Sequence, residues 1–309
     1  MMVPKEETAM EYREITVAHK RNLGAGCTPF CIERCGPDVD DSLHIHDFHQ
    51  LTIITRGTGV LVVNGAGYPV RAGDGYVIGS FSAHFLKETR GLEFVNILFY
   101  LRDLEPHCPG LLQNEGFRTL FYLQPVLEGR ARPSNIFSLD YAEIETVNRL
   151  LGQLLEEQRQ ALPGRELMIQ SIFLILITSL CRAYRNTAEP HAVFHSDQLC
   201  QAVQYMENNC AEPITLSDLE RLCGLTGRQL RHQFSQVYDC TPLQYLWNLR
   251  IRKACYYLAS TDLPISEIAS MTGFEDNNYF SRKFRQALGT TPREYRSQSR
   301  AGAAPPGRD

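Results

Sequence analysis

Three histidines and one glutamine form the group of residues best suited to bind a small ligand. His44 and His46 stand two positions apart, Gln50 follows them, and His84 lies further along the chain. Imidazoles at alternate positions of a strand point to the same side, so His44 and His46 would face one cavity. Such a group can hold a metal ion, line a pocket for an organic ligand, or form hydrogen bonds at the mouth of a barrel. The residues alone leave these three interpretations open.

A second group of polar residues lies on two short segments near the C-terminus. Apolar residues recur there at spacings of three and four, which predicts amphipathic helices with one exposed polar face. Arg donates a bidentate pair to guanine, and Asn or Gln does so to adenine, in the major groove of DNA. Any one of these side chains could instead contact phosphate or only solvent. The candidate base readers are Arg228, Gln229, Arg231 and His232 in the first helix and Asn277, Asn278, Ser281 and Arg282 in the second.

Each predicted reading helix is the second half of a helix-turn-helix. Gly273 ends a short helix and opens a tight turn, Asp276 is suited to cap the next helix, and Gly289 is suited to end it. Phe280 and Phe284 lie on the apolar face of that helix and must pack in the core. They are therefore excluded as base readers.

The helix-turn-helix pattern occurs twice. Residues 216–225 match residues 265–274 at an offset of 49, and residues 230–245 match residues 280–295 at an offset of 50. The second turn therefore has one extra residue, near Glu275, and Thr226 is the counterpart of Asp276. A predicted helix over 243–260 joins the copies, and another over 198–208 precedes them. Such a pair would place its reading helices in successive major grooves, about 34 Å apart.

The first third of the chain has the pattern of many short strands. Runs such as HQLTIITRG, GVLVVNG and LEFVNILFY are rich in β-branched and aromatic residues, and glycines separate them. This pattern predicts a sandwich or barrel up to about residue 105. Residues 106–136 are expected to hold short helices, and two long amphipathic helices are expected over 139–161 and 164–185. They would either dimerise or cover the barrel of their own chain.

Composition excludes several classes of protein. The chain has 309 residues, 43% hydrophobic and 21% charged, which fits a soluble protein of about two domains. A net charge of −4 argues against a protein that coats nucleic acid. The ten cysteines show no CxxC pair and are expected to be reduced, buried thiols. Charged residues near the N-terminus argue against an export signal, and the most apolar run, 172–180, is too short to cross a bilayer.

The repeated motif resembles the C-terminal signature of the AraC/XylS transcription regulators. This resemblance implies DNA binding, base contacts at the matching polar positions, and partners that include promoter DNA, RNA polymerase and a second copy of the chain. The matching residues in the second copy are Ile268, Ala269, Gly273, Phe274, Tyr279, Phe280, Phe284, Gly289, Pro292 and Tyr295.

The strand-rich part resembles a cupin barrel, in which two His, one Glu and a later His hold a metal. Here Gln50 takes the position of the Glu, and the second motif lacks its usual Pro. Loss of the negative ligand favours a binding pocket over a metal site, so no metal and no cofactor are expected.

Within the AraC/XylS family, the run HDFHQLTIITRGTGVLVVNG is similar to the sensor domain of L-rhamnose-responsive members. A polyol needs a ring of hydrogen-bond donors and acceptors beside an apolar face. The candidate effector-binding residues are His44, His46, His49, Gln50, Arg56, His84 and Asn96.

These features predict a multidomain α+β protein. An N-terminal cupin-like β-barrel (jelly roll) with two long helices precedes a C-terminal all-α domain with two helix-turn-helix motifs. The expected boundaries are 1–105 for the barrel, 106–185 for a helical extension that includes the dimerisation candidates, 186–196 for a linker, 197–300 for the DNA-binding domain and 301–309 for a disordered tail.

The predicted function is that of a cytoplasmic, sugar-responsive activator of transcription that is not an enzyme and does not enter membranes. One alternative is a metal-dependent cupin enzyme fused to a DNA-binding module. Another is a constitutive DNA-binding protein whose barrel only dimerises.

Overall fold

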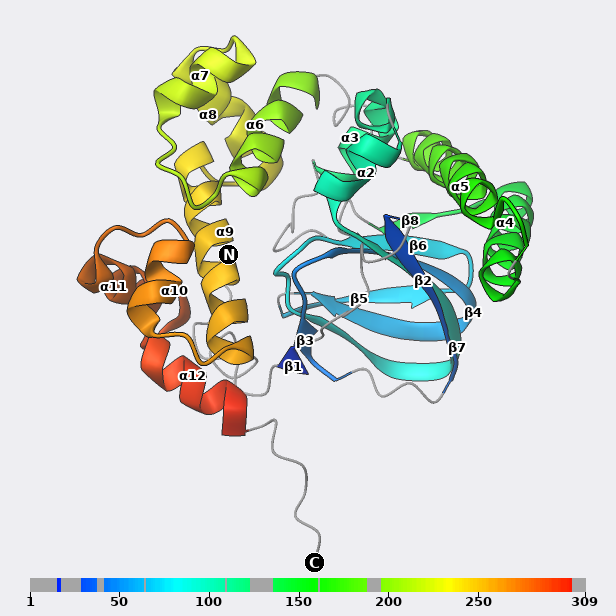
Figure 1. Cartoon of the computed structure of the whole chain (residues 1–309), viewed down its shortest axis with the longest axis horizontal. Coiled ribbons are helices and arrows are strands. Elements are labelled where there is room, and N and C mark those ends of the chain that lie inside the picture. Colours follow the sequence, from blue (N-terminus) through cyan, green and yellow to red (C-terminus); the bar gives the residue numbers. More distant parts are fainter. Residues whose placement is uncertain are drawn as a thin grey trace, which may run out of the picture.

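The structure is a computed structural model. It describes residues 16–17, 29–37, 42–63, 65–108, 110–122, 136–160, 162–187 and 196–301. A curved β-sheet with helices along its outer side forms one half of the molecule, and a purely helical part forms the other half (Figure 1). This arrangement confirms the predicted fold class.

One eight-stranded sheet forms the barrel half, with the strand order β1-β3-β7-β4-β6-β8, β2 paired to β7 and β5 paired to β4. The long strands β4 and β7 shift register between Ile54 and Val60, where the ribbon bends. Gly57 lies at this bend with φ +78°, and an added Cβ would collide with the backbone of Gly91. The strands are β1 (Thr16–Val17), β2 (Phe30–Cys35), β3 (His44–Ile45), β4 (His49–Val63), β5 (Ala66–Arg71), β6 (Asp74–Ile78), β7 (His84–Phe99) and β8 (Ile136–Ser138).

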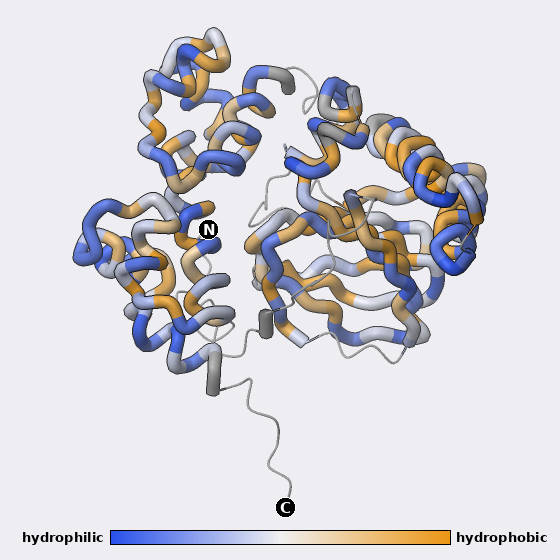
Figure 2. The backbone as a smooth tube through the Cα atoms, in the orientation of Figure 1, coloured by the Kyte–Doolittle hydropathy of each residue, from blue (hydrophilic) through white to orange (hydrophobic). Residues whose placement is uncertain are grey.

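Both faces of the sheet are buried along the first part of β4, residues 49–54, whereas β5 alternates buried and exposed residues. Leu51 and Ile53 of β4 belong to the apolar cluster shared with the covering helices. Ile54 belongs instead to a second cluster, with Tyr76 and Phe94, on the inside of the barrel. Figure 2 shows the resulting hydrophobic stretches along the strands. Because successive side chains alternate between faces, any polar side chain on the inner face is enclosed by the barrel.

Helices α4 and α5 cover the sheet from outside (Figure 1). Asp140 and Glu143 form a capping box at the start of α4. On α5, Phe173 stacks on Phe30 of β2 with ring centroids 4.0 Å apart. The helices of this half are α2 (Leu101–His107), η2 (Leu111–Gln113), α3 (Glu115–Phe121), α4 (Tyr141–Arg159) and α5 (Arg165–Thr187).

The helix α5 is longer than the apolar run noted in the sequence. Between Arg165 and Tyr184 it is long and apolar enough to cross a membrane, but half of that window is buried in the protein. Its buried side packs on the barrel, as expected of the core helix of a globular protein.

The helical half contains α6 (Ser196–Asn208), α7 (Leu216–Cys223), α8 (Gly227–Tyr238), α9 (Pro242–Ser260), α10 (Ile265–Met271), α11 (Asn277–Leu288) and α12 (Pro292–Ala301). The offsets of 49 and 50 residues reappear here, since α10 begins 49 residues after α7 and α11 begins 50 residues after α8. The first helix pair shares its core with the helices that cover the barrel, and the second pair packs on α9 around a core of its own.

Two predicted boundaries change. The sheet does not end near residue 105, because β8 pairs with β6 from within the predicted helical extension. A three-residue strand has too little pattern to be recognised, and only its long-range partner defines it. The expected linker is shorter, because α5 extends to Thr187 and α6 begins at Ser196. Residues 188–195 and 302–309, which include most of the expected linker and tail, lie outside the described residues.

Candidate functional site

The first candidate reading helix is α8. Gly224 has φ 65° and ends α7, and Thr226 then forms a capping box with Gln229 at the start of α8. Leu230 and Phe234 are fully buried, which fixes which side of the helix faces outward.

All four predicted readers of α8 are exposed, and Gln229 differs from the other three because it takes part in the helix cap. Arg228, Arg231 and His232 are exposed. Gln229 is also exposed, but its Oε1 accepts hydrogen bonds from the backbone N–H of Thr226 at 3.0 Å and from its hydroxyl at 2.8 Å. Gln229 would have to break this cap in order to reach a base. The roles of all four in reading DNA remain predictions.

The second candidate reading helix, α11, follows a constrained turn. Gly273 has φ 84°, and an added Cβ would lie 2.7 Å from the carbonyl oxygen of Cys210 and 2.8 Å from Nε of Arg250. Asp276 caps α11 by accepting a hydrogen bond from the Tyr279 N–H. Only glycine fits this turn, because both its backbone conformation and its surroundings exclude a side chain.

The buried Phe280 and Phe284 fix the inner side of α11. Asn277, Asn278 and Arg282 are exposed, and Ser281 is half-buried. The Arg282 guanidinium lies 5.8 Å from the centre of the Tyr279 ring, a cation–π contact that positions it at the surface. These four assignments also remain predictions.

Two residues of α9 that the sequence analysis did not single out connect the helix-turn-helix units. Arg250 is buried and donates hydrogen bonds to the carbonyl oxygens of Cys210 and Glu212, both at 2.7 Å. Burial lowers its pKa. Trp247 packs edge-on against Phe274 and carries the Lys283 ammonium 5.0 Å above its ring. The only sequence signal was their place on the joining helix.

Inside the barrel, a short polar network links β4 and β7. Gln50 donates to the Thr52 hydroxyl at 3.0 Å and to Asn96 Oδ1 at 3.4 Å, and the Thr52 hydroxyl donates to the same Asn96 oxygen at 2.8 Å. Gln50 and Thr52 are buried. Two of the predicted effector residues, Gln50 and Asn96, are therefore in direct contact.

The three predicted histidines lie together at the end of this network. His44 on β3 is paired directly with His84 on β7, and the ring centroids are 4.2 Å apart. The rings of His46 and His84 have centroids 4.9 Å apart. Gln50 lies close enough to influence the pKa of His46. The barrel thus brings five of the seven predicted effector residues into one region: His44, His46, Gln50, His84 and Asn96.

Burial favours the neutral form of the His46 and His84 imidazoles. It lowers the pKa of His46 to about 3, with a further contribution from His44. Burial also holds the pKa of His84 well below its usual value, assisted by His44 and His46. The Nε2 atoms of His46 and His84 are buried and have no hydrogen-bond partner among the described residues.

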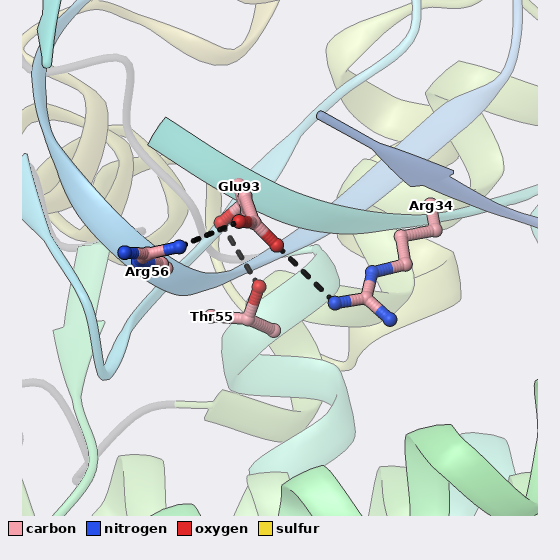
Figure 3. A network of polar contacts seen from close by, with 4 residues as sticks. All are labelled: Arg34, Thr55, Arg56 and Glu93. Carbon is pink, nitrogen blue, oxygen red and sulfur yellow. Dashed lines mark hydrogen bonds and ion pairs between the residues drawn. The ribbon is translucent and has the colours of Figure 1, made fainter. Parts of the chain in front are cut away.

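The other two predicted effector residues lie elsewhere. His49 packs on Phe99, and its Nε2 is 4.0 Å from the Glu207 carboxylate of α6, at the contact between the two halves. Arg56 is largely exposed and pairs with Glu93, which also binds Arg34 (Figure 3). Register explains both differences: His49 faces the other side of β4 from Gln50, and Arg56 lies at the bend of the ribbon.

A cavity of about 530 Å³ lies at another part of the barrel, and Thr58, Tyr68, Arg71, Asp74 and Arg90 are among its lining residues. None of the predicted effector residues lines it. We consider the histidine region the better candidate site, because its buried polar atoms lack partners that a ligand would supply.

Two family models match the chain. The model of an AraC-like ligand binding domain matches residues 27–177, and the model of a helix-turn-helix domain matches residues 219–298.

The HTH-type transcriptional activator RhaS of Enterobacter sp. strain 638 is 29% identical over 288 residues, which cover 91% of this chain and 97% of that protein. RhaS of Escherichia coli O6:H1 is 27% identical over 294 residues, which cover 93% and 99%. A solved AraC-type regulator from Chromobacterium violaceum, 34% identical, covers 33% of this chain and 91% of its own, with a TM-score of 0.32.

Proposed function

This chain belongs to the AraC family of transcription regulators, and from that premise we propose that it is a cytoplasmic transcription activator that responds to a small sugar such as L-rhamnose. Its curated relatives are named as activators, and they match this chain over nearly its whole length. In this proposal the barrel holds the effector, and α8 and α11 hold promoter DNA in successive major grooves.

The observation that carries the effector proposal is the buried polar network inside the barrel. Gln50, Thr52 and Asn96 form a polar patch inside the barrel, and an apolar cluster that includes Tyr68 and Tyr76 adjoins it, since Tyr76 of β6 is paired with Thr52. A deoxy sugar has hydroxyl groups for the polar patch and a methyl group and C–H face for the apolar cluster. The polar patch also counts against a barrel that serves only for dimerisation.

Calorimetry on the full chain tests the effector. L-rhamnose is expected to release or absorb heat at a stoichiometry of one per chain. Gln50→Leu should weaken binding about tenfold or more, because sugar hydroxyls lose a buried partner. The Arg56→Ala variant is the matched control and should bind as the wild type does. Absence of binding heat for a saturating panel of deoxy and simple sugars would contradict the proposal.

The contacts between the two halves support a route from effector to DNA. Arg252 of α9 donates to the Ser82 hydroxyl at 3.2 Å, and Tyr256 packs with Ile45 and Ala83 of the barrel. Ile45 lies between His44 and His46, and Ala83 precedes His84. An effector that binds these histidines with different affinity in two arrangements of the halves would shift the population between them.

The proposed partners beyond DNA and sugar are a second copy of this chain and RNA polymerase. Helix α5 exposes Leu167, Met168 and Ile175, which are 70%, 52% and 55% accessible. Leu167 and Ile175 are two turns apart on one side of the helix, so they form an apolar stripe of the kind that dimer interfaces cover.

A further inference from the structure

The two helix-turn-helix units meet along one side of α9. This helix runs from the first unit, α7 and α8, to the second unit, α10 and α11 (Figure 1). Leu246 and Leu249 of α9 belong to the apolar cluster of the first unit, whereas Ile251 belongs to that of the second. The change from one cluster to the other therefore takes place within residues 246–251, and a few side chains there can fix the orientation of the units.

Trp247 and Arg250 extend from this part of α9. They are three residues apart, so their side chains lie on the same side of the helix. The Trp247 ring packs edge-on against two rings of the second unit, with centroids 5.4 Å from Phe274 and 5.0 Å from Tyr279. Trp247 therefore connects the first-unit end of α9 directly to the second unit.

Arg250 extends this contact to the first unit. Its guanidinium donates hydrogen bonds to the carbonyl oxygens of Cys210 and Glu212, between α6 and α7, both at 2.7 Å. Gly273 of the second unit lies against the same group, since its added Cβ would be 2.8 Å from Arg250 Nε and 2.7 Å from the Cys210 oxygen. The turn before α11 and the segment before α7 are therefore in direct contact and are not joined through α9 alone.

The extra residue of the second turn also lies at this contact. The offsets of the two copies place that residue near Glu275. Burial lowers the pKa of Arg250, and the Glu275 carboxylate opposes this effect. A buried charge requires a charged or hydrogen-bonding partner. The longer second turn thus supplies a negative charge for the side chain that joins the units.

From these contacts we infer that Trp247 and Arg250 are positioning residues that set the separation of the two reading helices. We call the contact formed by Trp247, Arg250, Gly273 and Glu275 the junction. Because α8 and α11 read two half-sites, the junction determines how many base pairs must separate the half-sites for tight binding. This inference rests on the proposal that both helices bind DNA in successive major grooves.

A rigid junction makes DNA binding sensitive to the distance between the half-sites. One added base pair moves the second half-site by about 3.4 Å along the duplex and turns it by about 35° around the axis. Reading helices that are fixed to each other can then contact only one half-site fully. Without the Trp247 contact, α11 can turn relative to α8 and follow the displaced half-site.

Trp247 can be replaced without removal of the core of the second unit. That core contains the fully buried Phe280 and Phe284, whereas Trp247 is only half-buried. Trp247 also borders a groove of about 440 Å³, so part of its surface has no protein against it. A variant at this position therefore tests the junction and not the fold.

Duplexes with altered spacing test the inference on the full chain. Selection from random duplexes with the wild type identifies the two half-sites, and base pairs are then added or removed between them. The wild type should bind duplexes altered by one base pair about tenfold or more weakly, because one reading helix loses its base contacts. Trp247→Leu should reduce this ratio to about threefold or less, because loss of the edge-on ring contacts lets α11 turn. The readout is a ratio of affinities, so a uniform loss of DNA affinity cancels.

Two variants control for the substitution itself. Trp247→Phe keeps an aromatic ring at the junction and should retain the spacing preference of the wild type. Tyr256→Leu removes an aromatic ring from α9 on the side that packs on Ile45 and Ala83 of the barrel, and it should retain the preference as well.

A further variant decides the question if Trp247→Leu does not fold. Tyr279 is 37% accessible and supplies one of the two rings that Trp247 contacts. Tyr279→Leu therefore weakens the junction from the exposed side of α11, and it should lower the spacing ratio in the same direction.

The outcomes separate this inference from the proposed function. An unchanged spacing preference in Trp247→Leu, or in Tyr279→Leu where that variant decides, overturns the inference and leaves DNA binding by both helices standing. Equal affinity of the wild type for all spacings has the same meaning. Failure to select any sequence, or equal affinity for one half-site and for two, contradicts the proposed arrangement of α8 and α11 and overturns the inference with it.

Discussion

At the scale of single residues, Arg231 and Arg282 occupy similar positions on α8 and α11, and Lys283 differs from both. Arg231 and Arg282 both extend from the exposed side of a helix whose other side is anchored by buried Leu or Phe. Lys283, by contrast, lies over the Trp247 ring, so its ammonium is held close to α9. We therefore expect Arg231 and Arg282 to read bases and Lys283 to contact the DNA backbone.

Replacement of these arginines should have a sequence-specific effect. Arg231→Ala and Arg282→Ala should each lose roughly 1–3 kcal/mol of operator affinity and relax the preference at one base pair. Lys283→Ala should weaken operator and random DNA alike and reduce the salt slope by about one. Binding measured on operator and scrambled duplexes at several salt concentrations distinguishes the outcomes. Unchanged affinity and salt dependence in both arginine variants would show that α8 and α11 do not lie in the groove.

At the scale of elements, α5 has a buried apolar side and an exposed apolar side, and its sequence pattern does not distinguish them. Ile169, Phe173, Leu176 and Leu180 are buried, whereas Leu167 and Ile175 are exposed. Both sets are apolar, so the whole helix reads as hydrophobic. Only its position on the sheet separates the side that covers the core from the side that stays exposed.

The exposed stripe of α5 predicts a dimer. Leu167→Glu combined with Ile175→Glu should convert a dimer to a monomer in light scattering, because burial of two added carboxylates opposes association. Leu222→Glu, at an exposed position on α7, adds one carboxylate outside the stripe and should leave the mass unchanged. A wild-type chain that is monomeric at high concentration would contradict the assignment.

At the scale of the whole molecule, a small polar cluster lies between the barrel and the DNA-binding half. Glu207 of α6 accepts a hydrogen bond from the Tyr245 hydroxyl at 3.3 Å and lies 4.0 Å from His49. These residues and Arg252 surround a cavity of about 30 Å³. Burial raises the pKa of Glu207 to about 7, although Arg252 and Tyr245 oppose the shift.

Glu207 should make stability depend on pH. Its pKa in the folded chain lies above its ordinary value of 4.5, so the folded state holds the proton more tightly. Its contribution to the free energy of unfolding is therefore full below about pH 4.5 and is lost as the pH rises through about 7. Burial lowers the pKa of the neighbouring His49 to about 4, so His49 disfavours the folded state as the pH falls below about 6.5. Between about pH 4.5 and pH 6.5, a fall in pH therefore increases the contribution of Glu207 to the free energy of unfolding and decreases that of His49.

The difference between Glu207→Gln and the wild type isolates the contribution of Glu207. In urea unfolding over pH 4 to 8, Glu207→Gln should gain stability relative to the wild type above pH 7 and lose this advantage near pH 4.5. Glu267→Gln, exposed on α10, is the matched control. Parallel pH profiles for the wild type and Glu207→Gln would contradict this account of the interface.

The sequence by itself determined the helical half almost completely. Two copies at offsets of 49 and 50, the caps Thr226 and Asp276, and the turn glycines Gly224 and Gly273 are all local signals. Local hydrogen bonds and helix periodicity act within a few residues, so they can be read directly from the chain. The strands were recognisable for the same reason.

Only the tertiary structure decided which polar residues meet. It paired His44 with His84, turned His49 toward Glu207, left Arg56 outside on Glu93, added β8 to the sheet and placed Arg250 between the helix-turn-helix units. Each of these outcomes depends on register or on contact between distant segments, and a shift of one residue in register moves a side chain to the opposite face. His44, His46 and His84 lie together for this reason, and no local pattern in the sequence contains that information.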